Sequence, residues 1–176
     1  YDGNYVLITI SMNATQRYSN PVVTNDGAGT YSSGPGSNTG GANESPTTGA
    51  LWNFNTFIKV EGFNGATPVL TDYQFNLYYD FDPGLDTAIG SLGVINLTNA
   101  ILYSANPSAT VAQDSQNLLF GFLATSIPGF VTPPAGSFNP NALGEYNFGI
   151  QVSKSEWGVE GLAMDVQVVP EPGTVF

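Results

Sequence analysis

The sequence predicts an all-β protein folded as an antiparallel sandwich of seven or eight strands. Two observations support this fold class. Apolar and polar residues alternate with a period of two in several separate segments, which is the pattern of strands with one buried face. The chain also holds 21 glycines and 12 prolines among 176 residues, as a fold with many turns requires.

The N-terminal part contains the first predicted strand and a long loop. Over 4–14, Val6, Ile8 and Ile10 share one face, which predicts a strand buried on at least one side. The tract 25–49 is rich in Gly, Ser and Thr and has no strand or helix period. It predicts a long loop or linker, and a structureless loop of this length is either functional or disordered.

The middle of the chain predicts two strands, 50–63 and 69–81. The Asn64-Gly65 pair between them is a strong turn signal, so we expect the two strands to form a hairpin. Trp52 lies in phase with the buried face of the first strand, which predicts that it belongs to the core.

The remaining segments complete one domain over 1–169, of the jelly-roll or immunoglobulin-like kind. The prolines that follow exclude a continued central strand, so 170–176 is predicted to be an extended tail. The other predicted elements are apolar pieces at 92–97 and 100–104 (the second a strand or a helical turn), a buried strand at 117–125, a proline-rich connection at 127–141, and strands at 144–153 and 159–169.

Charge and missing residue types exclude many functions. The chain has 3 Lys and Arg against 14 Asp and Glu, a formal net charge of −11, and neither His nor Cys. It therefore lacks Cys-His and Ser-His-Asp catalytic groups and histidine-ligated zinc. Three cations cannot follow a phosphate backbone, so we expect no nucleic-acid partner. Glu156 and Glu160 flank a predicted turn and nothing marks either as a general acid, so we expect no enzymatic activity.

The chain ends in a Pro-Glu-Pro motif directly after the last predicted strand. This ending resembles the sorting signal of PEP-CTERM proteins, and 73–86, 114–123 and 132–152 are loosely similar to the extracellular part of such proteins. In that family the triplet precedes a transmembrane helix and an Arg-rich tail, both absent from this sequence. The residues of the motif are Val169, Pro170, Glu171, Pro172, Gly173 and Thr174.

The resemblance implies an exported protein of the cell surface or biofilm matrix of a Gram-negative bacterium, with a membrane-bound exosortase as its partner during sorting. The chain begins with Tyr1 rather than Met, so we expect a removed signal peptide. We expect no membrane segment in the mature form, because no apolar run of about 18 residues occurs.

The favoured function is a non-enzymatic structural protein that assembles into filaments. The strand 4–14 or the tail 166–176 would complete the sheet of the next subunit. A head-to-tail contact of this kind does not close and therefore gives a fibre. The alternative is a carbohydrate-binding surface module for extracellular polysaccharide, with calcium as the only cofactor to consider.

Two groups of residues are candidate sites. Asp80, Asp82 and Asp86 lie in one predicted turn and could supply oxygens to calcium, which takes 6–8 of them. The alternative is that these carboxylates only cap the turn through backbone hydrogen bonds. Trp157 and Tyr78 are candidate aromatic platforms for stacking against sugar rings.

Overall fold

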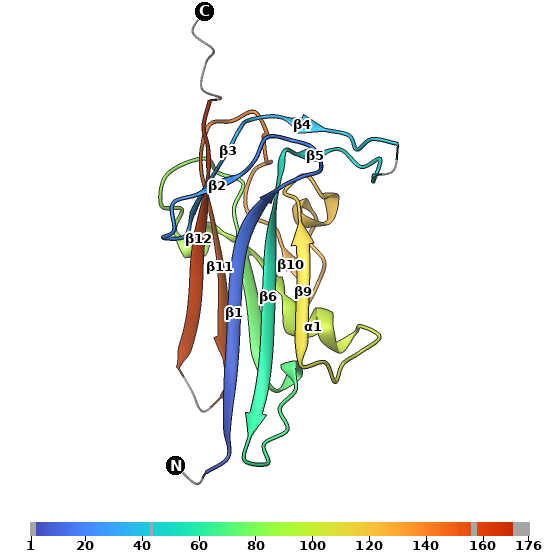
Figure 1. Ribbon diagram of the computed structural model, residues 1–176, viewed down its shortest axis with the longest axis vertical. Helices are drawn as coiled ribbons and strands as arrows, with labels where there is room; N and C mark the ends of the chain where they lie inside the picture. Colours follow the sequence, from blue (N-terminus) through green and yellow to red (C-terminus); the bar gives the residue numbers. More distant parts are fainter. Residues whose placement is uncertain (1–2, 43, 156–157, 171–176) are drawn as a thin grey trace, which may run out of the picture.

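The computed structural model describes residues 3–42, 44–155 and 158–170. β-strands dominate this part of the chain, and two facing sheets enclose the core (Figure 1). The all-β, sandwich-like fold is therefore as predicted. No helix in the described ranges is both long and apolar enough to cross a membrane.

The first sheet has three antiparallel strands in the order β1-β6-β9. They are β1 (Tyr5–Gln16), β6 (Trp52–Phe63) and β9 (Val111–Gln116). Along β6, burial alternates strictly from Trp52 to Val60, so one face enters the core and the other faces solvent. This is the pattern expected of an antiparallel sheet with one wet side.

The second sheet has the strand order β10-β8-β7-β11-β12-β3-β2. All its pairs are antiparallel except β12 with β3, which run parallel. Its strands are β2 (Thr24–Asn25), β3 (Thr30–Ser33), β7 (Gln74–Tyr79), β8 (Gly93–Asn96), β10 (Val131–Thr132), β11 (Gly144–Ser153) and β12 (Val159–Val168).

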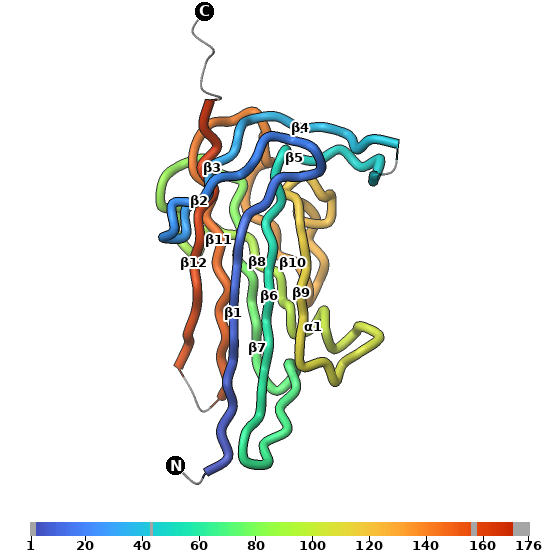
Figure 2. The backbone as a smooth tube through the Cα atoms, viewed as in Figure 1, coloured from blue at the N-terminus to red at the C-terminus, as the bar shows by residue number. Residues whose placement is uncertain are grey.

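The remaining elements are short and lie in the connections between the longer strands, as the tube in Figure 2 shows. The ambiguous piece at 100–104 falls at the end of a helical turn, whose N-terminus is capped by Asn96 Oδ1 accepting from the Asn99 N–H. The elements are β4 (Ser37–Asn38), β5 (Gly49–Ala50), α1 (Leu97–Leu102), η1 (Leu70–Asp72), η2 (Ile89–Ser91) and η3 (Gly121–Ala124).

The core between the sheets is rich in aromatic rings. Trp52 is 2% exposed, as predicted, and meets Phe148 edge-on with ring centroids 6.0 Å apart. Phe54 packs on the same Phe148 ring at 4.7 Å. The buried Tyr79 hydroxyl donates to the Leu123 carbonyl, which satisfies its polar end inside the core.

The predicted hairpin between 50–63 and 69–81 is wrong. The turn is present, with Asn64 and Gly65 both at positive φ, but β6 and β7 belong to opposite sheets. The chain crosses from one sheet to the other through η1, so the two strands do not pair with each other. Alternation and a turn signal identify neighbouring strands, but they do not distinguish pairing from packing across the core.

The strand predicted at 117–125 is also wrong. β9 ends at Gln116, and the following apolar run forms a turn and η3. Leu118 and Leu123 are buried, whereas Phe122 is 37% exposed, so burial there does not follow a period of two. A short apolar run can be buried either as a strand or as an irregular segment. Its periodicity does not distinguish the two structures.

The loop predicted over 25–49 is structureless only in part. Its residues 30–33 form β3, which pairs with the C-terminal half of β12, and Ser37–Asn38 forms β4. Such short polar strands leave no hydrophobic signal. The turn before β3 is held by Asp26, whose Oδ1 accepts from the Ala28 and Thr30 N–H groups; these backbone bonds lower the pKa of that carboxyl.

Arg17 holds the end of this tract in place. Its side chain is 2% exposed and its Nη2 donates to the Thr47 carbonyl at 2.5 Å and to the Tyr18 hydroxyl at 3.1 Å. The guanidinium also lies 4.7 Å from the Tyr18 ring centroid. A Cβ on Gly49 would meet Arg17 Nη1 at 1.2 Å, so glycine is required there for the close approach.

Candidate functional site

The first candidate site is the free edge of β1. β1 pairs with β6 in an unbroken register from Tyr5 opposite Phe63 to Gln16 opposite Trp52. In the described part of the chain, no strand pairs with its other edge. Over its 12 residues β1 has no charged residue, proline, glycine or bulge. Natural edge strands normally carry one of these features, because a bare edge can pair with another chain.

The seam between the sheets is open beside this edge. β1 contacts β12, but only Asp165–Val168 of β12 pairs with β3 on that side. The preceding half of β12 is exposed, with Val159 at 62% and Leu162 at 41%. The inward residues of β1 facing this region, Val6, Ile8 and Ile10, are only partly buried. The seam therefore combines unpaired backbone with incompletely covered apolar side chains.

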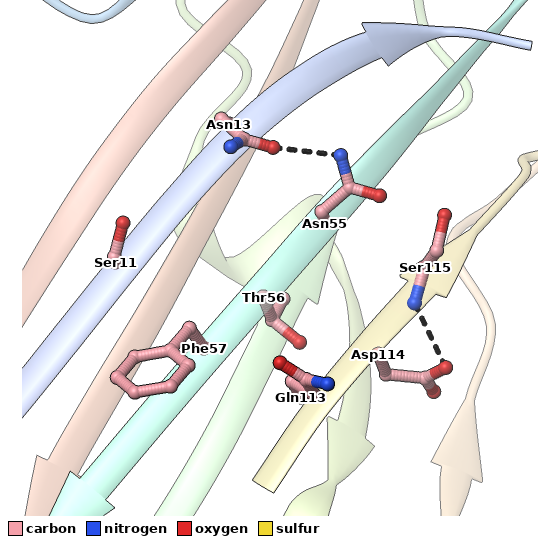
Figure 3. Close-up of a pocket in the computed structure, with 8 residues that line it drawn as sticks. All are labelled: Ser11, Asn13, Asn55, Thr56, Phe57, Gln113, Asp114 and Ser115. Atoms are coloured by element: carbon pink, nitrogen blue, oxygen red, sulfur yellow. Dashed lines mark hydrogen bonds between the residues drawn. The ribbon is translucent and has the colours of Figure 1, made fainter.

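The second candidate site is the solvent face of the same sheet, shown in Figure 3. Cross-strand register places Ser11, Phe57 and Gln113 in one row and Asn13, Asn55 and Ser115 in the next. These side chains line a shallow hollow of about 470 Å³. We call this surface the polar face.

The polar face ends in an exposed aromatic pair. Tyr5 and Phe63 stack with ring centroids 4.6 Å apart and planes at 7°. They remain 51% and 37% exposed. Tyr5, Phe63 and Phe57 all project from the solvent side of the sheet, because they share the alternation opposite to that of the buried residues.

The turn after β7 does not bring the three predicted calcium ligands together. Asp80 is fully buried, whereas Asp82 and Asp86 are exposed. Asp82 Oδ1 accepts from the Gly84 N–H at 3.0 Å, which is the turn-capping role that was the alternative. Among the described residues, no group of three or more acidic side chains could hold a metal ion. The calcium site therefore has no geometric support and stays a prediction.

Asp80 is nevertheless electrostatically unusual. Neither carboxylate oxygen has a hydrogen-bond partner of normal geometry. Burial raises the pKa of Asp80 from its ordinary 3.8 to about 7, and the negative charges of Asp82 and Glu145 add to this rise. The Thr87 hydroxyl and the Asn147 N–H lower the pKa in part. A carboxyl in this environment is held largely as the neutral acid at mildly acidic pH.

A second carboxyl with a raised pKa, that of Asp165, lies on the outer face of the large sheet. Burial raises the pKa of Asp165, with smaller contributions from Glu145 and other carboxylates. Asn147 Nδ2 donates to both Asp165 Oδ1 at 2.9 Å and Glu145 Oε1 at 3.1 Å. The amide therefore links two carboxylates that would otherwise repel each other.

The two predicted glycan-stacking residues have different outcomes. Tyr78 lies half-buried on the outer face of the large sheet, where it lines a hollow of about 410 Å³ with Asn147, Gly149 and Asp165. Its hydroxyl donates to Gln151 Oε1 at 2.9 Å. Trp157 lies outside the described residues, so its role stays a prediction.

The sorting motif is described only at its start. The Val169 N–H donates to the Ser33 carbonyl at 2.9 Å, which extends the ladder of β12 beside β3 by one bond. Pro170 is exposed. The remaining motif residues lie outside the described part: Glu171, Pro172, Gly173 and Thr174.

Sequence reasoning missed the polar face. It named the strand 4–14 as one of two candidates for strand addition, but whether this strand lies at a sheet edge depends on which strands pair, and local patterns do not contain that information. Phe57 was the only signal for the polar face, since it interrupts the polar side of an otherwise alternating strand. Comparison adds no relative: no family model matches the chain, and no curated protein or solved structure matches it significantly.

Proposed function

We propose that this chain is a non-enzymatic structural protein of the bacterial cell surface or extracellular matrix, which assembles into filaments through strand pairing. The observation that carries the proposal is the free, uncharged edge of β1. Its 12 residues carry no charge, proline or bulge, so none of the features that normally protect an edge strand opposes pairing with another chain. The resemblance of its C-terminus to a PEP-CTERM sorting signal supports the extracellular location and passage through an exosortase.

The same sheet offers a complementary second edge. β9 is the other terminal strand of β1-β6-β9. Pairing β1 of one copy with β9 of the next would continue the sheet from subunit to subunit. Such a contact joins two different surfaces, so it propagates instead of closing into a dimer. β1 then serves as the added strand while it remains in its own sheet.

Apolar contacts at the seam would add to the backbone hydrogen bonds. The inward side chains Val6, Ile8 and Ile10 are only partly covered in one copy. A neighbouring strand along β1 would remove part of their surface from water, at about 25 cal/mol per Å². The backbone hydrogen bonds would set the orientation of the two strands, and the burial of apolar surface would add to the free energy of association.

The test is the polymer state of purified protein over a dilution series, by negative-stain electron microscopy and light scattering. Wild type should form filaments that survive dilution. Ile8→Lys places a charge on the inward side of the edge strand, which opposes edge pairing, and this variant should remain monomeric. Leu85→Lys, an equally charged substitution in an exposed loop, should polymerise like wild type.

Mixing gives a sharper version of the same test. Ile8→Lys still has an intact β9 edge, so a small fraction of it should cap growing wild-type filaments and shorten them. Wild-type protein that stays monomeric at high concentration, with and without Ca²⁺, would overturn the proposal. Polymerisation of Ile8→Lys at the wild-type concentration would exclude β1 as the contact.

A further inference from the structure

We propose that the polar face binds a neutral, extended polysaccharide, which lies along β6 from the hollow around Phe57 toward the Tyr5–Phe63 stack. This inference goes beyond self-association and requires only one copy of the chain. It assigns a ligand class to a surface on the solvent side of the three-stranded sheet.

The first argument is the position of Phe57. It lies on the solvent side of β6, the central strand of the sheet. It is not among the described residues that form the core or pack against it. The ring is only partly buried on this side of the sheet, so part of its apolar surface remains accessible. The C–H faces of pyranose rings stack against such surfaces.

The second argument is the set of side chains around that ring. Asn13, Asn55 and Gln113 carry amides, and Ser11 and Ser115 carry hydroxyls. Both group types donate and accept hydrogen bonds, as sugar hydroxyls also do. The hollow therefore combines one aromatic ring with several side chains that can form hydrogen bonds to sugar hydroxyls.

The amides are also held in place. Asn55 Nδ2 donates to Asn13 Oδ1 at 2.6 Å and to Thr15 Oγ1 at 3.0 Å. These two bonds fix the amide plane of Asn55, and its oxygen points toward β9 (Figure 3). A polar group that is already oriented loses less rotational freedom when it binds a ligand.

The third argument is charge. The nearest cation on this face, Lys59, is paired with Glu61 at 2.7 Å. Asp114 accepts from the Ser115 N–H and from Gln116 Nε2. An anionic polymer would meet a chain of net charge −11 and no cation among the residues that line the hollow. The ligand that fits is therefore neutral.

The fourth argument is length. Phe57 and Phe63 lie on the same side of β6, six residues apart. At about 3.4 Å per residue, the two aromatic platforms are roughly 20 Å from each other. One sugar ring cannot contact both platforms, whereas an extended chain can. The proposed ligand is therefore a linear polymer lying parallel to the strand.

The experiment is calorimetric titration of wild-type protein, and of the Ile8→Lys variant that is expected to remain monomeric, with the neutral linear hexasaccharides cellohexaose and mannohexaose. Hexagalacturonate serves as an acidic counterpart. At least one neutral hexasaccharide should bind, and hexagalacturonate should not. Phe57→Ala should weaken binding at least tenfold, and Tyr5→Ala should weaken it less. Phe57→Trp should retain binding, which separates loss of the ring from loss of folding.

The matched control is Tyr103→Ala, which removes an exposed aromatic ring just after α1, away from the polar face. Its binding should equal that of wild type. Ile8→Lys should also bind normally, because Ile8 projects inward; this keeps a failure of assembly separate from a failure of sugar binding. Absence of binding to both neutral hexasaccharides at millimolar concentration would overturn the proposal. So would a loss in Tyr103→Ala as large as that in Phe57→Ala.

Discussion

The outer faces of the two sheets differ in charge although both are built from alternating strands. The polar face carries amides, hydroxyls and one internal ion pair, Lys59 with Glu61. The face of β7, β11 and β12 carries carboxylates, and burial together with the negative charge of Glu145 raises the pKa of Asp165. The negative charge of the chain is therefore unevenly placed. Like-charged faces repel one another, so the sheet with fewer carboxylates opposes contact with a second copy less strongly.

The largest predicted effect is the dependence of the free energy of unfolding on pH, and it comes from Asp80. Its pKa is about 7 in the folded protein against 3.8 ordinarily. The folded state therefore binds more protons than the unfolded state between these values, and the free energy of unfolding falls as pH rises from about 4 to 8. The loss is on the order of 4 kcal/mol. Asp80→Asn should flatten this pH dependence and stabilise the protein at pH 8.

Chemical denaturation at pH 4.5, 6 and 8 measures that effect. Asp82→Asn serves as the control, because Asp82 is exposed in the same turn; its pH dependence should stay close to that of wild type. A wild-type stability that rises between pH 4.5 and pH 8 would contradict the buried-acid interpretation.

A smaller loss of stability is expected at Asn117, which directly follows β9 of the three-stranded sheet. This side chain is fully buried. It accepts from the Ala50 N–H at 2.9 Å and donates to the Trp52 carbonyl at 2.7 Å. Asn117→Ala leaves these buried backbone groups without partners and should cost about 3 kcal/mol. Thermal unfolding measures it, with the exposed Asn141→Ala as control; equal melting temperatures for the two variants would refute the role of Asn117.

The smallest effect is expected at the ion pair on the polar face. Lys59 and Glu61 side chains are 38% and 37% exposed, and exposed pairs contribute about 0–1 kcal/mol. Glu61→Gln should therefore change stability by less than about 1 kcal/mol. It should, however, free the Lys59 charge and allow weak binding of hexagalacturonate, measurable by titration at low salt. Stability loss without any change in anion binding would contradict this description of the face.

The sequence predicted strands where alternation is long, and it failed where structure depends on partners. The segments 4–14, 144–153 and 159–169 lie at β1, β11 and β12 within a residue or two. The assignment of 50–63 and 69–81 to one hairpin failed, because an antiparallel partner and a strand across the core have the same period.

The candidate sites follow the same rule. Asp80, Asp82 and Asp86 are adjacent in sequence, but one is buried and two are exposed, since burial depends on what covers a turn. The polar face assembles residues from three strands, from Ser11 in β1 to Ser115 in β9, so no local motif could reveal it. Tyr78 is half-buried on the outer face of the large sheet, and its role in sugar stacking stays a prediction.

The few cations of this chain also determine where trypsin-like proteases, which cut after Lys or Arg, can cleave it. Arg17 is 2% exposed and bonded to Thr47, and Lys59 lies in a strand that is paired on both sides. Lys154 follows directly after β11 and contacts the Tyr73 ring at 5.0 Å. A folded backbone must open locally before it enters a protease cleft. The intact protein should therefore be cut first after Lys154, and its few cleavage points should give it a long lifetime in the presence of such proteases.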